Sequence, residues 1–256
     1  MAASDARRMA ILELVRTGKV VRVADLSRQF GVSEVSVRRD LGWLEECGLL
    51  KRVHGGAVAS SSAMPYDEDG NTPHLEEKQR IGRAAAQLVR PGERIILDSG
   101  TTVREIARQI AAQAANLQPL TVITASLRAF RELSLARGLG VIVLGGIYLP
   151  DFQTLVGPQT VAALQDLHVD KLFLGADGLS LAHGITSANV LEAEASRAMA
   201  RAAAETIVVA DSSKINSAGL ATIIPLARIH TLITDCAAPP EFVAALEQQG
   251  VKVVLV

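Results

Sequence analysis

Cysteine is scarce in this sequence, and its scarcity argues against a domain held together by disulfides or by a cysteine-bound zinc ion. Only two cysteines occur in 256 residues, Cys47 and Cys236, and they lie far apart without a CxxC spacing. A disulfide framework or a cysteine-rich zinc site needs more cysteines at shorter intervals. The histidines are scattered, with no pair at i and i+4, so we predict no metal site. They are His54, His74, His168, His183 and His230.

Long apolar runs are also missing, although 49% of the residues are hydrophobic. No run reaches the roughly 20 residues that a membrane-spanning helix needs. Residues 1–19 show no uninterrupted apolar segment followed by a small-residue cleavage site, as a secretory signal would. We therefore expect a cytoplasmic protein without membrane contact.

Several motifs for cofactors and catalysis are absent as well. The sequence has no GxGxxG after an expected strand, no Walker loop and no GxSxG elbow. These motifs serve dinucleotide binding, nucleotide hydrolysis and serine hydrolysis. We expect no cofactor and none of these three chemistries.

The net charge of -1 conceals an asymmetry between the two ends of the chain. Residues 1–60 carry 10 basic and 7 acidic side chains, whereas the remainder carries 16 and 20. A surplus of three positive charges is modest, and clustered surface charge is usually just solvated. The basic end favours a nucleic-acid partner only weakly, unless a motif supports it.

Three short helical patterns occupy residues 4–57, and a tight turn, GVS, separates the second from the third. Gly31 can close the second helix and Ser33 can cap the third, an arrangement typical of a helix-turn-helix. The following segment LLKRVHGGA alternates basic and apolar residues and ends on paired glycines, which predicts a small β wing. The third helix has a buried stripe at i, i+4 and i+7, formed by Val37, Leu41 and Leu44.

Arg38 and Arg39 face away from this stripe. An adjacent arginine pair is most often an ordinary exposed helix surface, but this pair lies in the first turns of the third helix. That end of a recognition helix enters the major groove of DNA, where arginine reaches guanine edges or phosphates. Trp43, beside the stripe, is expected to pack rather than stack on bases. The candidate DNA-binding residues are Ser33, Ser36, Arg38, Arg39, Lys51, Arg52 and His54.

The rest of the chain divides into a linker and a second domain. Residues 58–73 are small, polar and acidic, contain proline and show no periodicity, so residues 1–57 and 74–256 are expected to fold as separate domains. Beyond residue 74, helical stretches alternate with apolar runs, which predicts an α/β domain with a mostly parallel sheet covered on both faces. The expected strands are 94–98, 120–125, 140–146, 170–176, 206–211, 231–235 and 251–256.

The sequence DSGTT, residues 98–102, follows the first of these strands and leads into a helix. Such a turn offers backbone N–H groups, hydroxyls and a positive helix end to an anion. Its place at the carboxyl end of a parallel strand, where ligands bind in open α/β sheets, favours a phosphate site. The alternative is that Thr101 or Thr102 merely caps the helix.

Other loops at comparable strand ends supply further candidates. Asp177 can accept hydrogen bonds from ligand hydroxyls, and the cation Lys214 suits a phosphate. Asp211 could instead only form a turn, Lys214 could be a solvated charge, and Glu192 could only complement a helix dipole, so we place Glu192 below Asp177. The candidate effector-binding residues are Asp98, Ser99, Gly100, Thr101, Thr102, Asp177, Gly178, Glu192, Asp211 and Lys214.

Both halves of the chain resemble one known family. The segment VSEVSVRRDLGWLEECGLLKRVHGGA is similar to the winged helix-turn-helix of the DeoR-type bacterial transcriptional regulators. The segments ILDSGTT, VLGG, LFLGADGLS, HGITSANVLEAEASRAM and VVADSSK resemble, in order, the sensor domain of the same family. The resemblance implies a sensor fold similar to ribose-5-phosphate isomerase and the coenzyme A transferases.

The resemblance also implies a function. It suggests a repressor of sugar or amino-sugar catabolism genes that binds double-stranded operator DNA and is released by a small phosphorylated sugar or derivative. Because one recognition helix reads only a few base pairs, we expect a homodimer or homotetramer. The sequence leaves open the effector, the operator, the oligomer size and whether the regulator represses or activates.

Two features depart from the family pattern, and one alternative function remains. Ala125 stands where the family commonly has asparagine, and residues 147–151, IYLPD, stand where a basic residue is usual. The identity of the effector therefore does not follow directly from that of a relative. The alternative is a sugar-phosphate isomerase with Asp98, Asp177 or Asp211 as general base. HGITSANV lacks the lysine that such isomerases carry there, which argues for binding without turnover.

Overall fold

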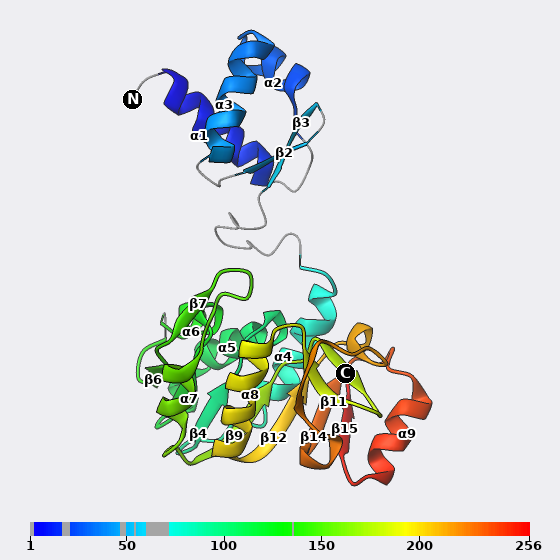
Figure 1. Cartoon of the computed structure of the whole chain (residues 1–256). Coiled ribbons are helices and arrows are strands. Elements are labelled where there is room, and N and C mark those ends of the chain that lie inside the picture. The colour runs from blue at the N-terminus through cyan, green and yellow to red at the C-terminus, as the bar shows by residue number, and fades with distance from the viewer. Residues whose placement is uncertain (1–2, 17–20, 47–49, 54, 60–71, 135) are drawn as a thin grey trace. The chain divides into compact units, whose positions relative to one another are not determined.

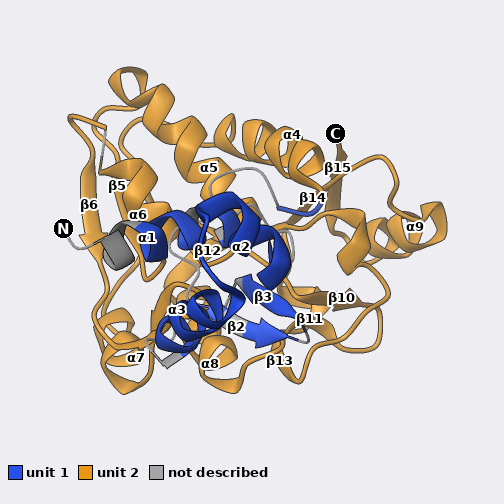
Figure 2. Cartoon of the chain, turned by 90° about the horizontal axis from the view of Figure 1, so that it is seen from above, with its two compact units in different colours: residues 1–73 blue, residues 74–256 orange. Residues whose placement is uncertain are grey.

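The computed structural model describes all residues except 1–2, 17–20, 47–49, 54, 60–71 and 135. It divides into two compact units, residues 1–73 and 74–256, which Figure 2 shows in separate colours. The second unit starts where the sequence places the start of the sensor domain. Within the described residues, no helix combines the length and apolar character that a bilayer crossing requires.

The first unit is a small helical fold with a three-stranded sheet in the order β1-β3-β2 (Figure 1). Its core contains apolar side chains from all three helices, among them Ile11, Leu26 and Leu41, together with Leu50 of the wing. The predicted helix-turn-helix and wing are therefore confirmed. The elements are α1 (Ala3–Arg16), β1 (Val21–Arg22), α2 (Val23–Phe30), α3 (Glu34–Glu46), β2 (Leu50–Val53) and β3 (Gly56–Ala59).

The turn between α2 and α3 forms as its residues predict. Gly31 adopts a left-handed conformation with φ of 64° and ends α2. The hydroxyl of Ser33 accepts a hydrogen bond from Ser36 N at 3.3 Å, at the start of α3. β2 and β3 pair antiparallel and join at Gly55 and Gly56, and β3 continues to Ala59, two residues beyond the expected end of the domain.

The second unit is built on a seven-stranded sheet in the order β15-β14-β12-β9-β4-β5-β6, with every adjacent pair parallel. All seven predicted strands are present, so the predicted parallel sheet is confirmed. Their bounds are β4 (Arg94–Leu97), β5 (Thr121–Thr124), β6 (Gly140–Val143), β9 (Val169–Leu174), β12 (Ala203–Val209), β14 (Thr231–Thr234) and β15 (Lys252–Leu255).

Helices cover both faces of this sheet. Alternate residues of each strand face opposite layers, because side chains alternate along a strand. Ile95 and Leu97 pack with the layer that contains α4 (Leu75–Ala86), α5 (Thr101–Ala112) and α6 (Leu127–Leu133). Ile96 packs with the layer that contains α7 (Pro158–Leu164), α8 (Val190–Ala202) and α9 (Pro240–Gln248).

Two small antiparallel sheets, which we did not predict, flank the carboxyl ends of the parallel strands. Their strands have three or four residues, too few for a clear alternating pattern in the sequence. They are β7 (Ile147–Leu149) with β8 (Thr154–Val156), and β10 (Gly178–Ser180) with β11 (Gly184–Ser187) and β13 (Ala221–Ile224). Short 3-10 helices complete the unit: η2 (Ala114–Asn116), η3 (Ser212–Lys214) and η4 (Leu226–Arg228).

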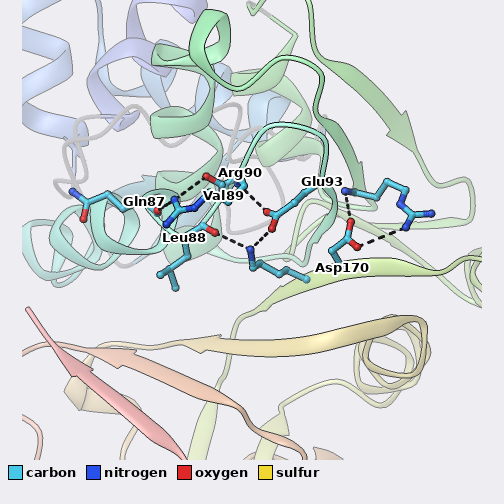
Figure 3. Close-up of polar contacts among 8 residues, drawn as sticks. Gln87, Leu88, Val89, Arg90, Glu93 and Asp170 are labelled. Atoms are coloured by element: carbon cyan, nitrogen blue, oxygen red, sulfur yellow. Dashed lines mark hydrogen bonds and ion pairs between the residues drawn. The ribbon is translucent and has the colours of Figure 1, made fainter.

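The amino ends of β4 and β9 carry a polar network that fixes these strands (Figure 3). Lys171 donates to the carbonyl oxygen of Leu88 at 2.8 Å and pairs with Glu93. Asp170 accepts from Arg94 N at 2.8 Å, and its other oxygen lies 3.6 Å from the Arg94 guanidinium. These four charged side chains are therefore paired with one another at the amino ends of β4 and β9.

Candidate functional site

The outer surface of α3 presents the predicted arginines. Val37, Leu41 and Leu44 are fully buried, whereas Arg38 and Arg39 are exposed. The Arg38 guanidinium lies 2.8 Å from the Glu34 carboxylate one turn earlier, an exposed pair of small energy. Both arginines are therefore available to DNA.

Three of the remaining predicted DNA contacts, Ser33, Ser36 and Arg52, are described by the structure. Ser33 and Ser36 lie at the start of α3, with their hydroxyls 3.1 Å apart. Arg52 is exposed on β2, and its backbone N–H donates to Glu45 at 2.8 Å, which ties the wing to α3. The Lys51 side chain and all of His54 lie outside the described part of the chain.

One residue of α3 differs from our expectation. Trp43 is 43% exposed and does not join the buried stripe. It lies two residues after Leu41, and two residues turn a helix by about 200°, so its ring leaves the core face. The Arg8 guanidinium lies 4.4 Å from the ring centroid, in a cation–π arrangement. Trp43 therefore packs against Arg8 on the surface and not in the core, and the expectation that it does not stack on bases stays a prediction.

A cavity of about 190 Å³ lies at the carboxyl ends of the parallel strands in the second unit. The residues that line it come from α4, α5, α6 and α8, from the loops after β4, β9 and β12, from the turn between β7 and β8, and from β11 and β13. They are Lys78, Asp98, Ser99, Gly100, Thr101, Thr102, Arg128, Asp151, Phe152, Gly175, Ala176, Asp177, Ser187, Glu192, Ser196, Ala210, Lys214 and Ile223.

The DSGTT turn forms one wall. Gly100 has φ of 107°, a conformation that side chains disfavour, and it is the residue that precedes the first residue of α5. Gly100 supplies no side-chain cap, and α5 has no acidic residue in its first turn. The first N–H groups of a helix have no partner within the helix, so this end of α5 presents donors and partial positive charge beside the Thr101 and Thr102 side chains.

A second wall is acidic. Asp98 and Glu192 are 5% and 8% exposed, and the Ser99 hydroxyl donates to Glu192 at 2.5 Å. Burial and the nearby Glu192 carboxylate raise the pKa of Asp98 to about 7, and burial also raises the pKa of Glu192. The Ser196 hydroxyl donates to Asp98 at 3.1 Å. This wall therefore retains a proton near neutral pH and can both donate and accept hydrogen bonds.

Ser187 connects this wall to Asp177. Its hydroxyl lies 3.0 Å from a Glu192 oxygen and 3.1 Å from an Asp177 oxygen, although a hydroxyl has only one proton to donate. Asp177 is exposed and accepts from Ala188 N at 2.8 Å. Glu192 is more deeply buried than Asp177, and the ranking of Asp177 above Glu192 as a ligand contact stays a prediction.

A third group of lining residues is cationic: Lys78, Arg128 and Lys214. The Lys78 ammonium lies 3.7 Å from an oxygen of Asp211, which is 1% exposed. Burial lowers the pKa of Lys78, with an opposing effect from Asp211 and a further lowering from Lys214. The lysines are thus close enough to repel one another, and an anion between them would relieve that repulsion.

The structure brings most of the predicted residues together at this cavity. Eight of the ten predicted effector residues line it. The other two do not: Gly178 lies in β10, and Asp211 forms an ion pair with Lys78, which does line the cavity. Ala125 is buried without lining the cavity, whereas Asp151, within the departing segment, does line it.

The sequence reasoning missed Lys78, Arg128, Ser187 and Ser196. One signal could have found Lys78: it shares a stripe with Ile81, Gly82 and Ala85 at i, i+3, i+4 and i+7, and all four are buried. A lysine on a buried stripe is rare without a charge partner. The serines carry no comparable signal.

Comparisons with known proteins agree with this architecture. The DeoR-like helix-turn-helix domain matches residues 7–63, and the DeoR C terminal sensor domain matches residues 73–236. The chain is 37% identical over 254 residues to the putative aga operon transcriptional repressor of Escherichia coli O157:H7, covering 98% of this chain and 93% of that protein.

Two further relatives are repressors. The HTH-type transcriptional repressor GlcR of Bacillus subtilis is 33% identical, over 97% of this chain and 95% of GlcR. The lactose phosphotransferase system repressor of Streptococcus mutans is also 33% identical, over 88% and 90%. Among solved structures, ribose 5-phosphate isomerase of Plasmodium falciparum aligns with 17% identity and a TM-score of 0.43, over 57% of this chain and 55% of the isomerase.

A winged helix-turn-helix followed by an α/β sensor domain defines a one-component transcriptional regulator. The chain belongs to the DeoR family of such regulators. Members of this family regulate transcription and are not enzymes. We therefore reject the alternative that the chain is a sugar-phosphate isomerase.

Proposed function

We propose that this protein represses genes of sugar catabolism and leaves its operator when a phosphorylated sugar fills the cavity of the second unit. The observation that carries the proposal is the cavity itself, which combines the DSGTT turn and three cations with a wall of buried carboxyl groups. The printed names of two relatives, an aga operon repressor and a lactose phosphotransferase system repressor, support a sugar-related role.

The phosphate would bind at the DSGTT turn. The first N–H groups of α5, the hydroxyls of Thr101 and Thr102, and the ammonium groups of Lys78 and Lys214 all border the same cavity. A dianionic phosphate accepts many hydrogen bonds and gains from each nearby cation, so this wall suits it better than a neutral group.

The sugar hydroxyls would face Asp98, Asp177 and Glu192. Hydroxyl groups both donate and accept, and a wall that retains a proton offers partners for both kinds of hydrogen bond. Arg128 lines the same cavity as Glu192, and its positive charge offsets part of the negative charge there. A ligand with a phosphate at one end and hydroxyls at the other fits both walls.

The operator would be read by α3 and the wing. Arg38 and Arg39 would contact base edges, with Ser33, Ser36, Lys51, Arg52 and His54 on neighbouring positions or phosphates. We propose a dimer or tetramer, since two recognition helices on two half-sites give the affinity that one helix lacks. The cytoplasmic location stays a prediction.

The phosphate site is tested by a screen and one variant. The screen measures the melting temperature with ribose 5-phosphate, glucose 6-phosphate, fructose 6-phosphate, glucosamine 6-phosphate and the unphosphorylated sugars. A ligand at 100 times its dissociation constant stabilises by about 2.7 kcal/mol, so a true effector gives a clear shift. Thr101→Glu places a negative charge where the phosphate must bind and should abolish that shift.

Thr101→Ser is the matched control, because it keeps the hydroxyl and should respond almost as the unchanged protein does. Operator selected from random DNA then shows whether the same ligand causes release. A normal response of Thr101→Glu would contradict the phosphate site.

A further inference from the structure

Lys78 is placed to act on both the cavity and the helix that follows the linker. Its side chain is 7% exposed, lines the cavity, and forms an ion pair with Asp211 at 3.7 Å. It lies in the first turn of α4, where its backbone N–H donates to the carbonyl oxygen of His74 at 3.1 Å. α4 begins at Leu75, directly after the last residues of the linker.

Asp211, the carboxylate that forms an ion pair with Lys78, is held in place, but one of its oxygens accepts no hydrogen bond from the described residues. One oxygen of Asp211 accepts from Ser213 N at 3.1 Å and is fixed by η3. The other oxygen is buried and accepts no hydrogen bond from the residues that the structure describes. At 3.7 Å the Lys78 ammonium attracts this oxygen without a hydrogen bond of normal length, so a better acceptor can compete for it.

The helix that begins at the turn proposed to hold the phosphate, α5, packs against α4. A Cβ added to Gly82 of α4 would lie only 2.7 Å from the Cβ of Glu105 in α5. The two helices are therefore too close at this point to leave room for a side chain at position 82. The amino end of α5 is the DSGTT turn. A change at this turn and a change at Lys78 would therefore act on the same pair of packed helices.

We propose that Lys78 is shared between Asp211 and the phosphate of the effector, and that its transfer to the phosphate shifts the start of α4 and the attached linker. This inference rests on the proposed function. In one state Lys78 pairs with Asp211, and in the other it binds the phosphate of the ligand. A ligand that binds one of two states better shifts the balance between them, and the start of α4 would carry that shift toward the DNA-binding unit.

A double-mutant cycle tests the exchange. The four proteins are the unchanged chain, Lys78→Gln, Asp211→Asn, and the double variant. Calorimetry measures their affinity for the sugar phosphate that gives the largest shift in the screen. Asp211→Asn removes the competitor for Lys78 but keeps an oxygen for Ser213, so the ligand should bind several-fold more tightly.

The double variant separates exchange from general electrostatics. If Asp211 acts through Lys78, Asp211→Asn should have no effect in the Lys78→Gln background, a departure from additivity that the cycle measures directly. Removing a distant negative charge would help an anion equally in both backgrounds. Equal effects would overturn the inference and leave the proposed function standing, whereas an unchanged chain that binds none of the sugar phosphates would overturn both.

The coupling between ligand binding and DNA binding is tested separately, by measuring operator affinity with and without ligand. Allosteric ligands typically change the affinity of a second site by about 5- to 150-fold. At saturating ligand, the Lys78→Gln, Asp211→Asn double variant should keep nearly the same operator affinity as without ligand. Lys214→Gln is the matched control: it removes a cation from the same cavity but from η3, so it should weaken ligand binding and still release the operator fully. Full release by the double variant would overturn the role of Lys78 in coupling.

Discussion

Asp98 shows most clearly how its surroundings change the chemistry of a residue. Its carboxyl group is buried next to Glu192, and both effects raise its pKa from the ordinary 3.8 to about 7. Between these pH values the folded protein holds a proton that the unfolded chain has released. The contribution of Asp98 to stability is therefore complete below about pH 4 and is lost as the pH rises through 7. Burial of Glu192 acts in the same direction.

We predict that Asp98→Asn flattens the dependence of stability on pH. The free energy of unfolding of the unchanged protein should fall between pH 5 and pH 8, with Asp98 contributing roughly 2 to 4 kcal/mol at about 1.4 kcal/mol per pKa unit. The variant has no proton to lose at that position, so urea unfolding at several pH values should show a smaller decrease. Asp170→Asn is the control, since Arg94 lowers the pKa of that exposed carboxyl and the neutral range should not change. An equal decrease in both variants would contradict the assignment to Asp98.

A second prediction at this scale concerns Arg38 and Arg39. Replacing both with alanine should weaken operator binding by about 1 to 3 kcal/mol for each arginine that contacts a base edge. Stability should change little, because both side chains are exposed and the buried stripe is untouched. Gel-shift titration measures the first effect and thermal unfolding the second. Unchanged operator affinity would rule out α3 as the recognition helix.

Among the elements, the pairing of α4 with α5 sets the shape of the cavity. Both helices contribute lining residues, and Gly82 permits their close approach. A side chain at this position meets the Glu105 backbone as well as its Cβ, at 2.9 Å and 2.7 Å, so the two helices would have to separate.

We predict that Gly82→Ala destabilises the second unit even though alanine favours helix formation. Overpacking typically costs about 1 to 3 kcal/mol, which exceeds the gain of up to about 1 kcal/mol from propensity. Ala84→Gly, on the same helix and only partly buried, isolates the propensity effect and provides the control. Ligand affinity should fall in Gly82→Ala as well, since the separation moves Lys78 relative to the DSGTT turn. A more stable variant with unchanged affinity would contradict this packing argument.

We expect the wing to contact DNA differently from α3, through phosphates and not through bases. Arg52 is exposed on β2, and its backbone is tied to Glu45. If its side chain contacts only phosphate, Arg52→Ala should weaken binding to operator and unrelated DNA alike and reduce the slope against salt concentration by about one. Measurements at several salt concentrations check this. Lost discrimination with an unchanged slope would show that Arg52 reads bases.

For the whole molecule, the division into two units separates DNA reading from ligand sensing. Each unit has its own buried core, and the cavity lies wholly within residues 74–256. The effect of a ligand bound in this cavity on DNA binding must therefore pass from one unit to the other.

A dimer with two recognition helices makes a prediction about operator geometry. Two half-sites should lie about one helical turn of DNA, 10 to 10.5 base pairs, or a multiple of it apart. Inserting about half a turn between them should weaken binding strongly, whereas inserting a full turn should weaken it less, because the half-sites return to the same face. Gel shifts with the three operators measure this, and sedimentation gives the oligomer size. Equal affinity for all three operators would argue for one recognition helix per operator.

The sequence by itself determined the helix-turn-helix, the wing and the seven strands of the parallel sheet. The stripe of α3, the glycine after α2, the paired glycines of the wing and the seven apolar strands are local patterns, and each formed where it was predicted. The DSGTT turn could also be placed, since the end of a buried strand followed by a helix start is visible without knowing the fold. The exposure of Trp43 did not follow from its apolar neighbours, because a neighbour in sequence need not share a helix face.

Only the tertiary structure decided which side chains meet in the cavity. Ser99 and Glu192 are 93 residues apart, and Asp98 and Ser196 are 98 apart, yet each pair is joined by a hydrogen bond. The raised pKa of Asp98 depends on burial and on a carboxylate from another helix. Likewise, Lys78 and Asp211 become partners only when α4 packs beside the end of β12. Such long-range contacts follow from the packing of whole elements, and no local pattern in the chain encodes them.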